Sequence, residues 1–236
     1  MIENSKIVIK SYEVDHKGLL KPFSFLNYAQ ELANIDAAQL GFGYDNIRES
    51  GVLWVLSRIN VKFTQMPKWR DELLSSTWHK GVDKLFGLRD FLISKPDGSP
   101  MITATSSWLI IDNHSRKIRR IESVIGDDFT GGKQFNAIES PAEKIPSIKG
   151  GFIVKNHTVT YSDLDINGHT NNAKYIEWIV DSLPWEYVNN NIIKEFTLNF
   201  NHETIIEDTI EIIYLNSDNI HFFEGIKGDK SIFTAK

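Results

Sequence analysis

The sequence contains no cysteine among its 236 residues. This absence excludes disulfide bonds, thiolate metal ligands and a cysteine nucleophile. Long hydrophobic runs are missing as well, because no stretch approaches the roughly 18 apolar residues that a membrane-spanning helix needs. Residues 1–14 alternate charged and apolar side chains where a signal peptide would have a basic start and an apolar core. We therefore expect a cytoplasmic protein that does not enter a membrane.

Positive charge is also scarce relative to negative charge. The chain has 26 Lys and Arg against 31 Asp and Glu, which gives a net charge of -5 and a sequence pI near 5.8. This balance argues against nucleic acid as a partner. Hydrophobic residues make up 41% and charged residues 24%, as in ordinary globular proteins, and the length suits one large domain or two of usual size.

The first half of the chain reads as one long helix and a run of strands. Between residues 23 and 40 apolar side chains, many of them alanine, recur three or four positions apart, and Gly41 ends the pattern. Alternating apolar and polar residues predict strands at 6–14, 53–65, 73–79, 85–94 and 101–111. One helix with a series of antiparallel strands indicates an α+β fold.

Residues 112–149 show no sustained period and hold several glycines and prolines, so we expect a connector there, with a short helix near Asp127. Near its start, basic side chains cluster at Arg116, Lys117, Arg119 and Arg120. A solvated basic turn is the ordinary interpretation of this cluster. A docking patch for an acidic partner is the alternative.

After the connector the same order of elements returns. We expect a strand at 151–161, a turn at 163–169, a helix at 171–183 and strands at 192–213 and 221–235. An internal repeat supports this order, because Asp15, Gly18, Phe25 and Tyr28 match Asp165, Gly168, Tyr175 and Trp178 at an offset of 150. In the same way Ile59, Val61, Phe63 and Asp71 match Phe196, Leu198, Phe200 and Asp208.

The two copies differ at the turn. The second copy has Asn167 and His169 where the first has Lys17 and Leu19. The second turn therefore sets a carboxylate (Asp165), a carboxamide and an imidazole at alternate positions just before a helix N-terminus, where negative charge is favoured. These are groups that an acyl transfer uses. The first copy has lost two of them, which suggests that it serves binding.

The longer pattern, D-x-D-x-N-x-H-x-N-N-x-x-Y from Asp163 to Tyr175, resembles the second half of the acyl-acyl-carrier-protein (acyl-ACP) thioesterases of plants and bacteria. The resemblance extends over nearly the whole chain. It implies two tandem hotdog domains, each a long antiparallel sheet wrapped on a central helix. On this reading residues 1–125 form an acyl-binding domain, 126–150 a linker and 151–236 a catalytic domain.

The resemblance also implies an active site made of Asp165, Asn167, His169 and Glu203. Asp165 would act either as a covalent nucleophile or as a general base for water, and Glu203 would position the water or assist His169. The N–H groups of Gly168 and His169 are the expected oxyanion donors. Plant members often have a cysteine at the position of Thr204, so a thiol mechanism is excluded for this chain.

Some expectations concern neighbouring positions. Asp163, Asn171, Asn172 and Tyr175 belong to the motif as capping or supporting residues. A strand pattern would turn Glu203 away from the face that carries Phe196, so a bulge or a special geometry is needed to aim it inward.

The small residues Ala33 and Ala37, with Leu53 and Val55, are the candidates for the wall of an acyl-binding tunnel. Lys117, Arg119 and Arg120 are the candidates for docking the acidic carrier. No cofactor and no metal is expected, because no His, Asp or Glu spacing fits a metal site.

The resemblance implies hydrolysis of acyl-ACP with release of a free fatty acid, by a monomer or a homodimer. Three alternatives remain open. They are an acyl-CoA thioesterase, a hotdog hydratase and a catalytically silent acyl-binding hotdog protein. Comparing turnover of acyl-ACP and acyl-CoA tests the acyl-CoA thioesterase. Tight binding of acyl thioesters without turnover would identify the silent acyl-binding protein.

Overall fold

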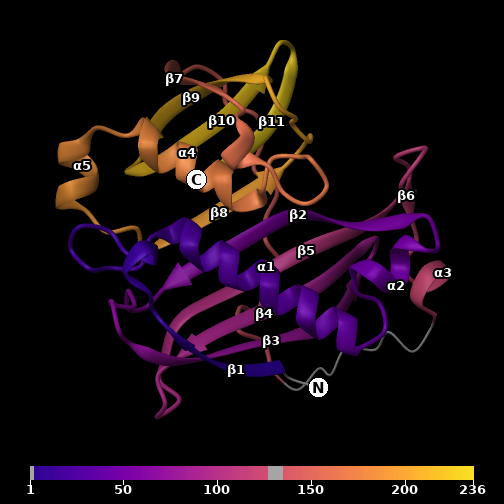
Figure 1. Cartoon of the computed structure of the whole chain (residues 1–236). Coiled ribbons are helices and arrows are strands. Elements are labelled where there is room, and N and C mark those ends of the chain that lie inside the picture. Colours follow the sequence, from indigo (N-terminus) through magenta and orange to yellow (C-terminus); the bar gives the residue numbers. More distant parts are fainter. Residues whose placement is uncertain (1–2, 127–134) are drawn as a thin grey trace. The chain divides into compact units, whose positions relative to one another are not determined.

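The structure is a computed structural model that describes residues 3–126 and 135–236. The chain divides into two compact units, Met1–Ala142 (unit 1) and Glu143–Lys236 (unit 2). Each unit contains a central helix and an antiparallel set of strands (Figure 1).

Unit 1 is built on five long strands in the order β1-β3-β4-β5-β2. Their bounds are β1 Glu3–Val8, β2 Val52–Phe63, β3 Glu72–Asp83, β4 Phe86–Ser94 and β5 Pro100–Asp112. Every neighbouring pair is antiparallel, and the short β6, Ile118–Arg119, pairs with β5. The helices are α1 (Pro22–Gln39), α2 (Tyr44–Arg48) and α3 (Glu122–Ile125), and Ser11–Glu13 form the 3-10 helix η1.

Helix α1 runs across one face of these strands (Figure 1). Pro22 occupies its first turn, where a missing N–H costs nothing. The buried face combines large side chains with alanines, and Phe25 meets Phe63 of β2 edge to face with ring centroids 6.4 Å apart. The helix lies within one residue at each end of the predicted one, and the strand predictions from β2 to β5 are also confirmed.

Unit 2 repeats this plan with shorter elements. Its strands follow the order β8-β11-β10-β9-β7, all antiparallel. Their bounds are β7 Phe152–Thr158, β8 Glu195–Phe200, β9 Thr209–Ser217, β10 Ile220–Lys227 and β11 Lys230–Ala235. The helices are η2 (Tyr161–Asp163), α4 (Asn172–Ser182) and α5 (Trp185–Asn190). On α4, Tyr175 packs against Phe200 and Phe233, with ring centroids 5.7 and 5.3 Å away.

The structure corrects the extent of several strands. The first strand ends at Val8 instead of Val14, because Ser11–Glu13 already turn as η1. The segment 192–213, expected to supply strands, holds β8 and β9, and Glu203 lies in the loop between them instead of in a strand. The segment 221–235, also expected to supply strands, is the hairpin of β10 and β11, which turns at Gly228 with φ 61°.

The predicted internal repeat is confirmed by backbone hydrogen bonds. In unit 1 the N–H of Ile9 donates to Asp71 O at 3.0 Å, and in unit 2 Val159 donates to Asp208 O at 2.8 Å. The residues before these acceptors, Arg70 and Glu207, both adopt the left-handed conformation, with φ of 72° and 69°. Such values are uncommon for residues other than glycine, so their agreement shows that the two loops share one backbone conformation.

The connector is held against the sheets by buried polar groups. Asp90 of β4 accepts the N–H of Ala137 at 2.8 Å, and Lys80 of β3 donates to Ile138 O at 2.6 Å. In unit 2, Asn199 of β8 accepts the N–H of Ile145 at 2.7 Å. The helix predicted near Asp127 falls outside the described residues. The domain bounds of 125 and 151 and the assignment of a role to each domain stay predictions.

Candidate active site

The polar turn before α4 is shaped by one carboxylate. Oδ1 of Asp165 accepts the N–H groups of Asn167 at 2.8 Å and His169 at 3.2 Å, an arrangement that Asp side chains favour in turns. Gly168, with φ 75°, supplies the left-handed residue that closes the turn, and its N–H donates to Asp165 O at 3.0 Å. The turn therefore fixes the backbone positions of Asn167 and His169, from which their side chains project.

The turn also brings together two side chains that are 34 positions apart in the sequence. A backbone bridge joins His169 to Ile205, in the loop after β8. It places Nε2 of His169 3.8 Å from Oε2 of Glu203, with side chains 31% and 36% exposed. This separation exceeds a hydrogen bond, and both groups are open to solvent and to a substrate. Because β8 ends at Phe200, strand alternation does not govern the direction of Glu203, and no bulge is needed.

A buried hydroxyl network lies beneath this pair. Thr204 is fully buried, and its hydroxyl donates to the hydroxyl of Thr170 at 2.7 Å and lies 3.0 Å from that of Tyr175. Burial, with a smaller contribution from the negative charges of Glu203 and Asp165, raises the pKa of Tyr175 to about 12, although the hydrogen bonds to Thr204 and Thr170 act in the opposite direction. The phenol is therefore a neutral hydrogen-bonding group at physiological pH, and the Thr204 hydroxyl is enclosed by its partners.

Motif residues outside the turn support it. Asn171 is the N-cap of α4, and its side chain accepts the N–H of Ala173 at 2.9 Å. Asp163 accepts from the N–H of Thr160 at 2.8 Å and lies 3.1 Å from Nε2 of His157. Although burial opposes the effect, these contacts hold the pKa of Asp163 below its usual value. The capping role predicted for Asn171 is confirmed.

The predicted oxyanion donors are already engaged within the turn. Gly168 donates to the carbonyl of Asp165, and His169 donates to its carboxylate. Both also precede α4, which begins at Asn172. Stabilising an oxyanion would require one of these N–H groups to exchange its partner for the substrate.

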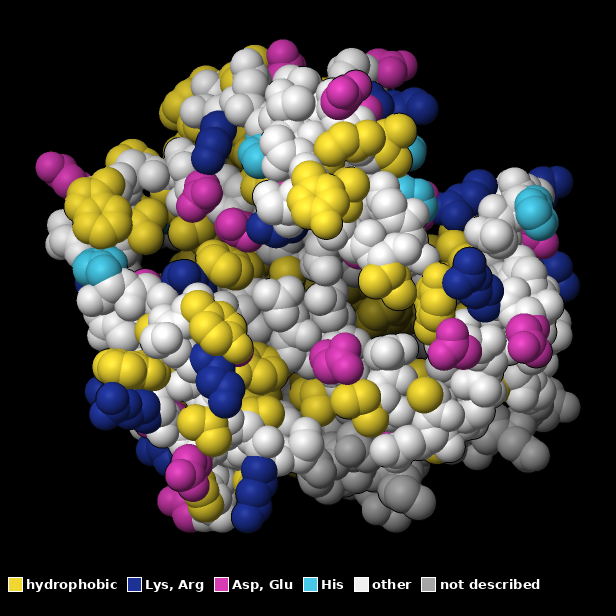
Figure 2. Space-filling model, in the orientation of Figure 1, with side chains coloured by type: hydrophobic (Ala, Val, Ile, Leu, Met, Phe, Trp, Pro, Cys, Tyr) yellow, Lys and Arg dark blue, Asp and Glu magenta, His cyan; other side chains and the backbone are white. Residues whose placement is uncertain are grey.

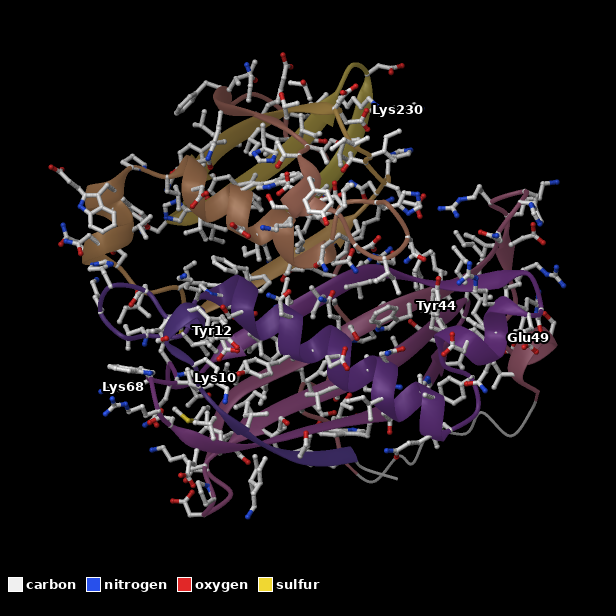
Figure 3. The ribbon with its side chains drawn as sticks, in the orientation of Figure 1. Lys10, Tyr12, Tyr44, Glu49, Lys68 and Lys230 are labelled. Carbon is white, nitrogen blue, oxygen red and sulfur yellow. The ribbon has the colours of Figure 1, made fainter. Side chains whose placement is uncertain are left out.

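Unit 1 contains the same turn with other side chains. Oδ1 of Asp15 accepts the N–H groups of Lys17 at 2.8 Å and Leu19 at 3.0 Å. A backbone bridge joins Leu19 of this turn to Lys68, in the loop after β2 (Figure 3). The carboxylate is thus part of the turn in both units, although the residue four positions later is Leu19 in unit 1 and His169 in unit 2.

The counterpart of Glu203 is found from the hydrogen bonds. Leu20 N donates to Pro67 O at 2.8 Å in unit 1, and Thr170 N donates to Thr204 O at 2.9 Å in unit 2. Pro67 therefore matches Thr204, and Met66 stands where unit 2 has Glu203. Unit 1 lacks the counterparts of Asn167, His169 and Glu203 and keeps only the aspartate.

Unit 1 has a cavity of about 180 Å³ beside the second half of α1. Ala33, Ala37 and Leu53, which were predicted to bind an acyl chain, line it, whereas Val55 lies outside the lining. Helix α2, which carries Tyr44 (Figure 3), forms another wall.

Polar side chains also line the unit 1 cavity. Nη1 of Arg89 lies 2.5 Å from Oδ2 of Asp36, and both side chains are at most 5% exposed. Beside them, burial lowers the pKa of His79 to about 3, an effect to which the charge of Arg89 adds. These residues escaped the sequence reasoning. The available signal was a charged residue, Asp36, within the alanine-rich face of the helix.

The predicted docking residues Lys117, Arg119 and Arg120 are exposed around β6. Nη1 of Arg119 lies 3.6 Å from Oδ2 of Asp112, so part of its charge is locally balanced. Within the described part of the chain, no three His, Asp or Glu side chains gather as around a metal ion. No helix among residues 3–126 and 135–236 is long and apolar enough to cross a membrane.

An antiparallel sheet on a central helix, present twice in one chain, defines the class of tandem hotdog proteins. Residues 3–129 match the family described as "Acyl-ACP thioesterase N-terminal domain". Residues 148–233 match the family described as "Acyl-ACP thioesterase C-terminal domain". The chain belongs to the acyl-ACP thioesterase family.

Individual relatives agree with this membership. The chain is 28% identical to an acyl-ACP thioesterase from Bacteroides thetaiotaomicron, with a TM-score of 0.87 over 99% of this chain and 96% of that one. It also shares the fold of the 12:0-ACP thioesterase from Umbellularia californica, with a TM-score of 0.86 at 22% identity over 99% and 95% of the two chains.

Among curated proteins, the chloroplastic oleoyl-acyl carrier protein thioesterase 1 of Arabidopsis thaliana is 24% identical over 231 residues, 91% of this chain and 64% of that protein. The chloroplastic acyl-[acyl-carrier-protein] hydrolase FATB2 of Cuphea viscosissima is 29% identical over 215 residues, 86% of this chain and 52% of that protein. The chain thus spans between half and two thirds of the length of these two relatives.

Proposed function

We propose that this chain hydrolyses the thioester of acyl-ACP and releases a free fatty acid. The observation that supports this best is the contrast between the two turns. They share one backbone geometry, yet only the turn of unit 2 combines Asp165, Asn167 and His169 with Glu203. Family membership supplies the substrate class.

In this reaction an oxygen nucleophile attacks the carbonyl carbon, the carbon–sulfur bond breaks, and the leaving thiolate takes a proton. Oδ1 of Asp165 is occupied by the turn, so we assign the reactive role to Oδ2. As a nucleophile this oxygen forms a mixed anhydride that water then cleaves, and as a base it removes a proton from the attacking water. Mass spectrometry of rapidly quenched enzyme distinguishes the two routes, because only the nucleophilic route places an acyl group on Asp165.

His169 and Glu203 complete the proposed site. Their separation of 3.8 Å suits a pair that meets a shared water or the leaving thiol, with one group donating and the other accepting a proton. Asn167, on the same turn, is positioned to orient Asp165 or the substrate carbonyl. We propose the acyl carrier protein as the partner and the cytoplasm as the compartment, with a monomer or a homodimer in solution.

The test uses substitutions that the fold has already accepted in unit 1. His169→Leu and Glu203→Met place in unit 2 the residues that unit 1 carries at the same positions, so the turn should keep its shape. Each should lower release of fatty acid from acyl-ACP by about 10² or more, the scale of a lost general acid or base.

Release is measured over a panel of acyl-ACPs, with the corresponding acyl-CoAs beside them. If the wild type releases fatty acid faster from acyl-CoA than from acyl-ACP, coenzyme A would replace the acyl carrier protein as the proposed carrier. If the chain binds acyl-ACP tightly but releases no fatty acid, it is an acyl-binding protein and the proposed hydrolysis is wrong.

A further inference from the structure

Unit 2 contains a cavity of its own, with a volume of about 490 Å³. It lies between α4, α5 and the beginnings of β8 and β10, and it does not include the reactive turn. Its walls are mainly apolar, with the aliphatic Ile176, Ile179, Leu183 and Val188 and the aromatic Phe196 and Phe223 among them. The volume falls within the range of roughly 300 to 1,000 Å³ that is usual for small-molecule sites.

The cavity exists because the central helix of unit 2 is short. Helix α4 has 11 residues where α1 has 18, and β8 has 6 residues where β2 has 12. Pro184 then redirects the chain, and the short α5 covers the end of the sheet that a longer helix would have filled. A helix held away from the sheet leaves unfilled space beneath it.

Helix α5 is fastened over this space by a polar contact. The hydroxyl of Tyr187 lies 2.6 Å from Nε2 of His221 on β10, and the hydroxyl of Tyr214 lies 2.9 Å from Nδ1 of the same ring. Hydrophobic side chains gather around α5 on the face drawn in Figure 2. Trp185 of this helix is 64% exposed.

Charged side chains of the lining lie at one end of the sheet. Because β8, β11 and β10 are antiparallel neighbours, the start of β8, the end of β11 and the start of β10 coincide there. Lys194 precedes β8, and Lys236 follows β11. Lys236 pairs with Glu143, and the neighbouring Glu195 also lines the cavity. Lys194 is exposed at this end, beside Glu195.

We propose that this cavity binds the alkyl chain of a fatty acid, with the carboxylate at Lys194. Apolar walls suit an alkyl chain, since they offer few partners to a polar ring, and the ammonium group of Lys194 suits one carboxylate. The choice of a fatty acid rests on the proposed function, which makes that molecule as its product. The site is separate from the reacting residues, so its occupant is a second ligand and not the thioester under attack.

The experiment titrates cis-parinaric acid, a fluorescent fatty acid, into the full chain. It is carried out in an Ala37→Phe background, in which the unit 1 cavity is narrowed against a long alkyl chain such as that of the probe, so that the remaining binding reports on unit 2. One equivalent should bind. Val188→Trp on α5 and Ile220→Trp on β10 fill the unit 2 cavity from opposite walls, and each should abolish that equivalent while the melting temperature stays near that of the parent.

The charge is tested with Lys194→Gln. It should weaken binding of a fatty acid by up to about fivefold relative to the fatty alcohol of equal length, measured by displacement of cis-parinaric acid. Lys230→Gln, at the opposite end of β11 (Figure 3), is the matched control and should change neither ligand.

Unchanged stoichiometry in both tryptophan variants would overturn the site, and equal effects of the two lysine variants would overturn the placement of the carboxylate. Binding does not depend on turnover. A chain that binds cis-parinaric acid in this way but leaves acyl-ACP intact would therefore refute the proposed function and keep the site.

Discussion

Asp165 and Asp15 make the same two backbone hydrogen bonds, and only the turn of Asp165 has a histidine four positions later, His169, with a glutamate near its ring. The shared hydrogen bonds distinguish two roles of the aspartate, holding the turn and taking part in a reaction. Oδ1 shapes the turn in both units, and any chemistry has to come from what Asp165 has in addition.

Substituting each aspartate by asparagine tests this separation. Asparagine keeps an acceptor oxygen for the two N–H groups but loses the negative charge, so both variants should fold. Asp165→Asn should lower turnover on acyl-ACP by about 10² or more, whereas Asp15→Asn should leave it within about twofold. An equal loss in both variants would mean that turn geometry, and not charge, sets the rate.

His79 makes stability depend on pH. Nδ1 of its ring accepts the N–H of Gly81 at 3.1 Å, and burial holds the pKa of His79 at about 3 in the folded state. The unfolded chain binds a proton near pH 6.5, so the unfolded state carries more protons between pH 6.5 and 3. The contribution of His79 is complete above pH 6.5 and declines as the pH falls through this window.

The loss should reach about 1.4 kcal/mol per pH unit within that window. Urea unfolding from pH 7 to 4 measures it, and His79→Gln should flatten the profile. His202 has its Nδ1 2.7 Å from Ser231 O on an exposed loop, and His202→Gln serves as the control that should keep the wild-type slope. The same slope in His79→Gln would assign the pH dependence to other groups.

At the scale of elements, the alanines of α1 decide how much room unit 1 offers. Ala33 and Ala37 line the cavity, and replacing either by Phe removes volume where an acyl tail would lie. The preferred acyl chain should become shorter, with about 1 kcal/mol of discrimination per lost methylene contact, while cleavage persists.

Release rates across acyl-ACPs of graded length measure this shift. Val55 lies outside the lining, so Val55→Ala is the control that should keep the wild-type profile. A changed profile in Val55→Ala, with none in folded Ala33→Phe, would move the acyl tail out of this cavity.

Elements with a long hydrophobic period could be predicted from the sequence, and short ones could not. Helices α1 and α4 carry three or more turns of one apolar face, so their positions were found within one residue. Helices α2 and α5, with 5 and 6 residues, are too short to display a period, although each walls a cavity.

The candidate site divides in the same way. Asp165, Asn167 and His169 are close in sequence and form a recognisable motif. The approach of Glu203 depends on a loop whose direction strand alternation cannot give. The Asp36–Arg89 pair joins a helix to a strand 53 positions away, and local patterns contain no information on such a contact.

At the scale of the whole molecule, charge should govern the encounter with the proposed carrier. The chain has a net charge of -5, and an acyl carrier protein is acidic, so association needs a local cationic surface. Lys117 and Arg120 flank Arg119, whose charge is shared with Asp112. Reversing both, as Lys117→Glu with Arg120→Glu, should lower kcat/KM for acyl-ACP about tenfold or more, and added salt should lower it in the wild type.

Hydrolysis of a small thioester should stay unchanged in the same variant, because the reacting groups are untouched. Lys6→Glu with Lys230→Glu makes the same change in net charge elsewhere and is the matched control. If both double variants lower kcat/KM for acyl-ACP equally, the overall charge and not this patch controls the encounter.

The paired turns also show how much of a site belongs to its scaffold. An acceptor oxygen at Asp15 or Asp165 holds the backbone of its own turn, and both turns keep these two hydrogen bonds although unit 1 has Lys17, Leu19 and Met66 where unit 2 has Asn167, His169 and Glu203. The aspartate is therefore the position at which the two turns can be aligned when the side chains around it differ.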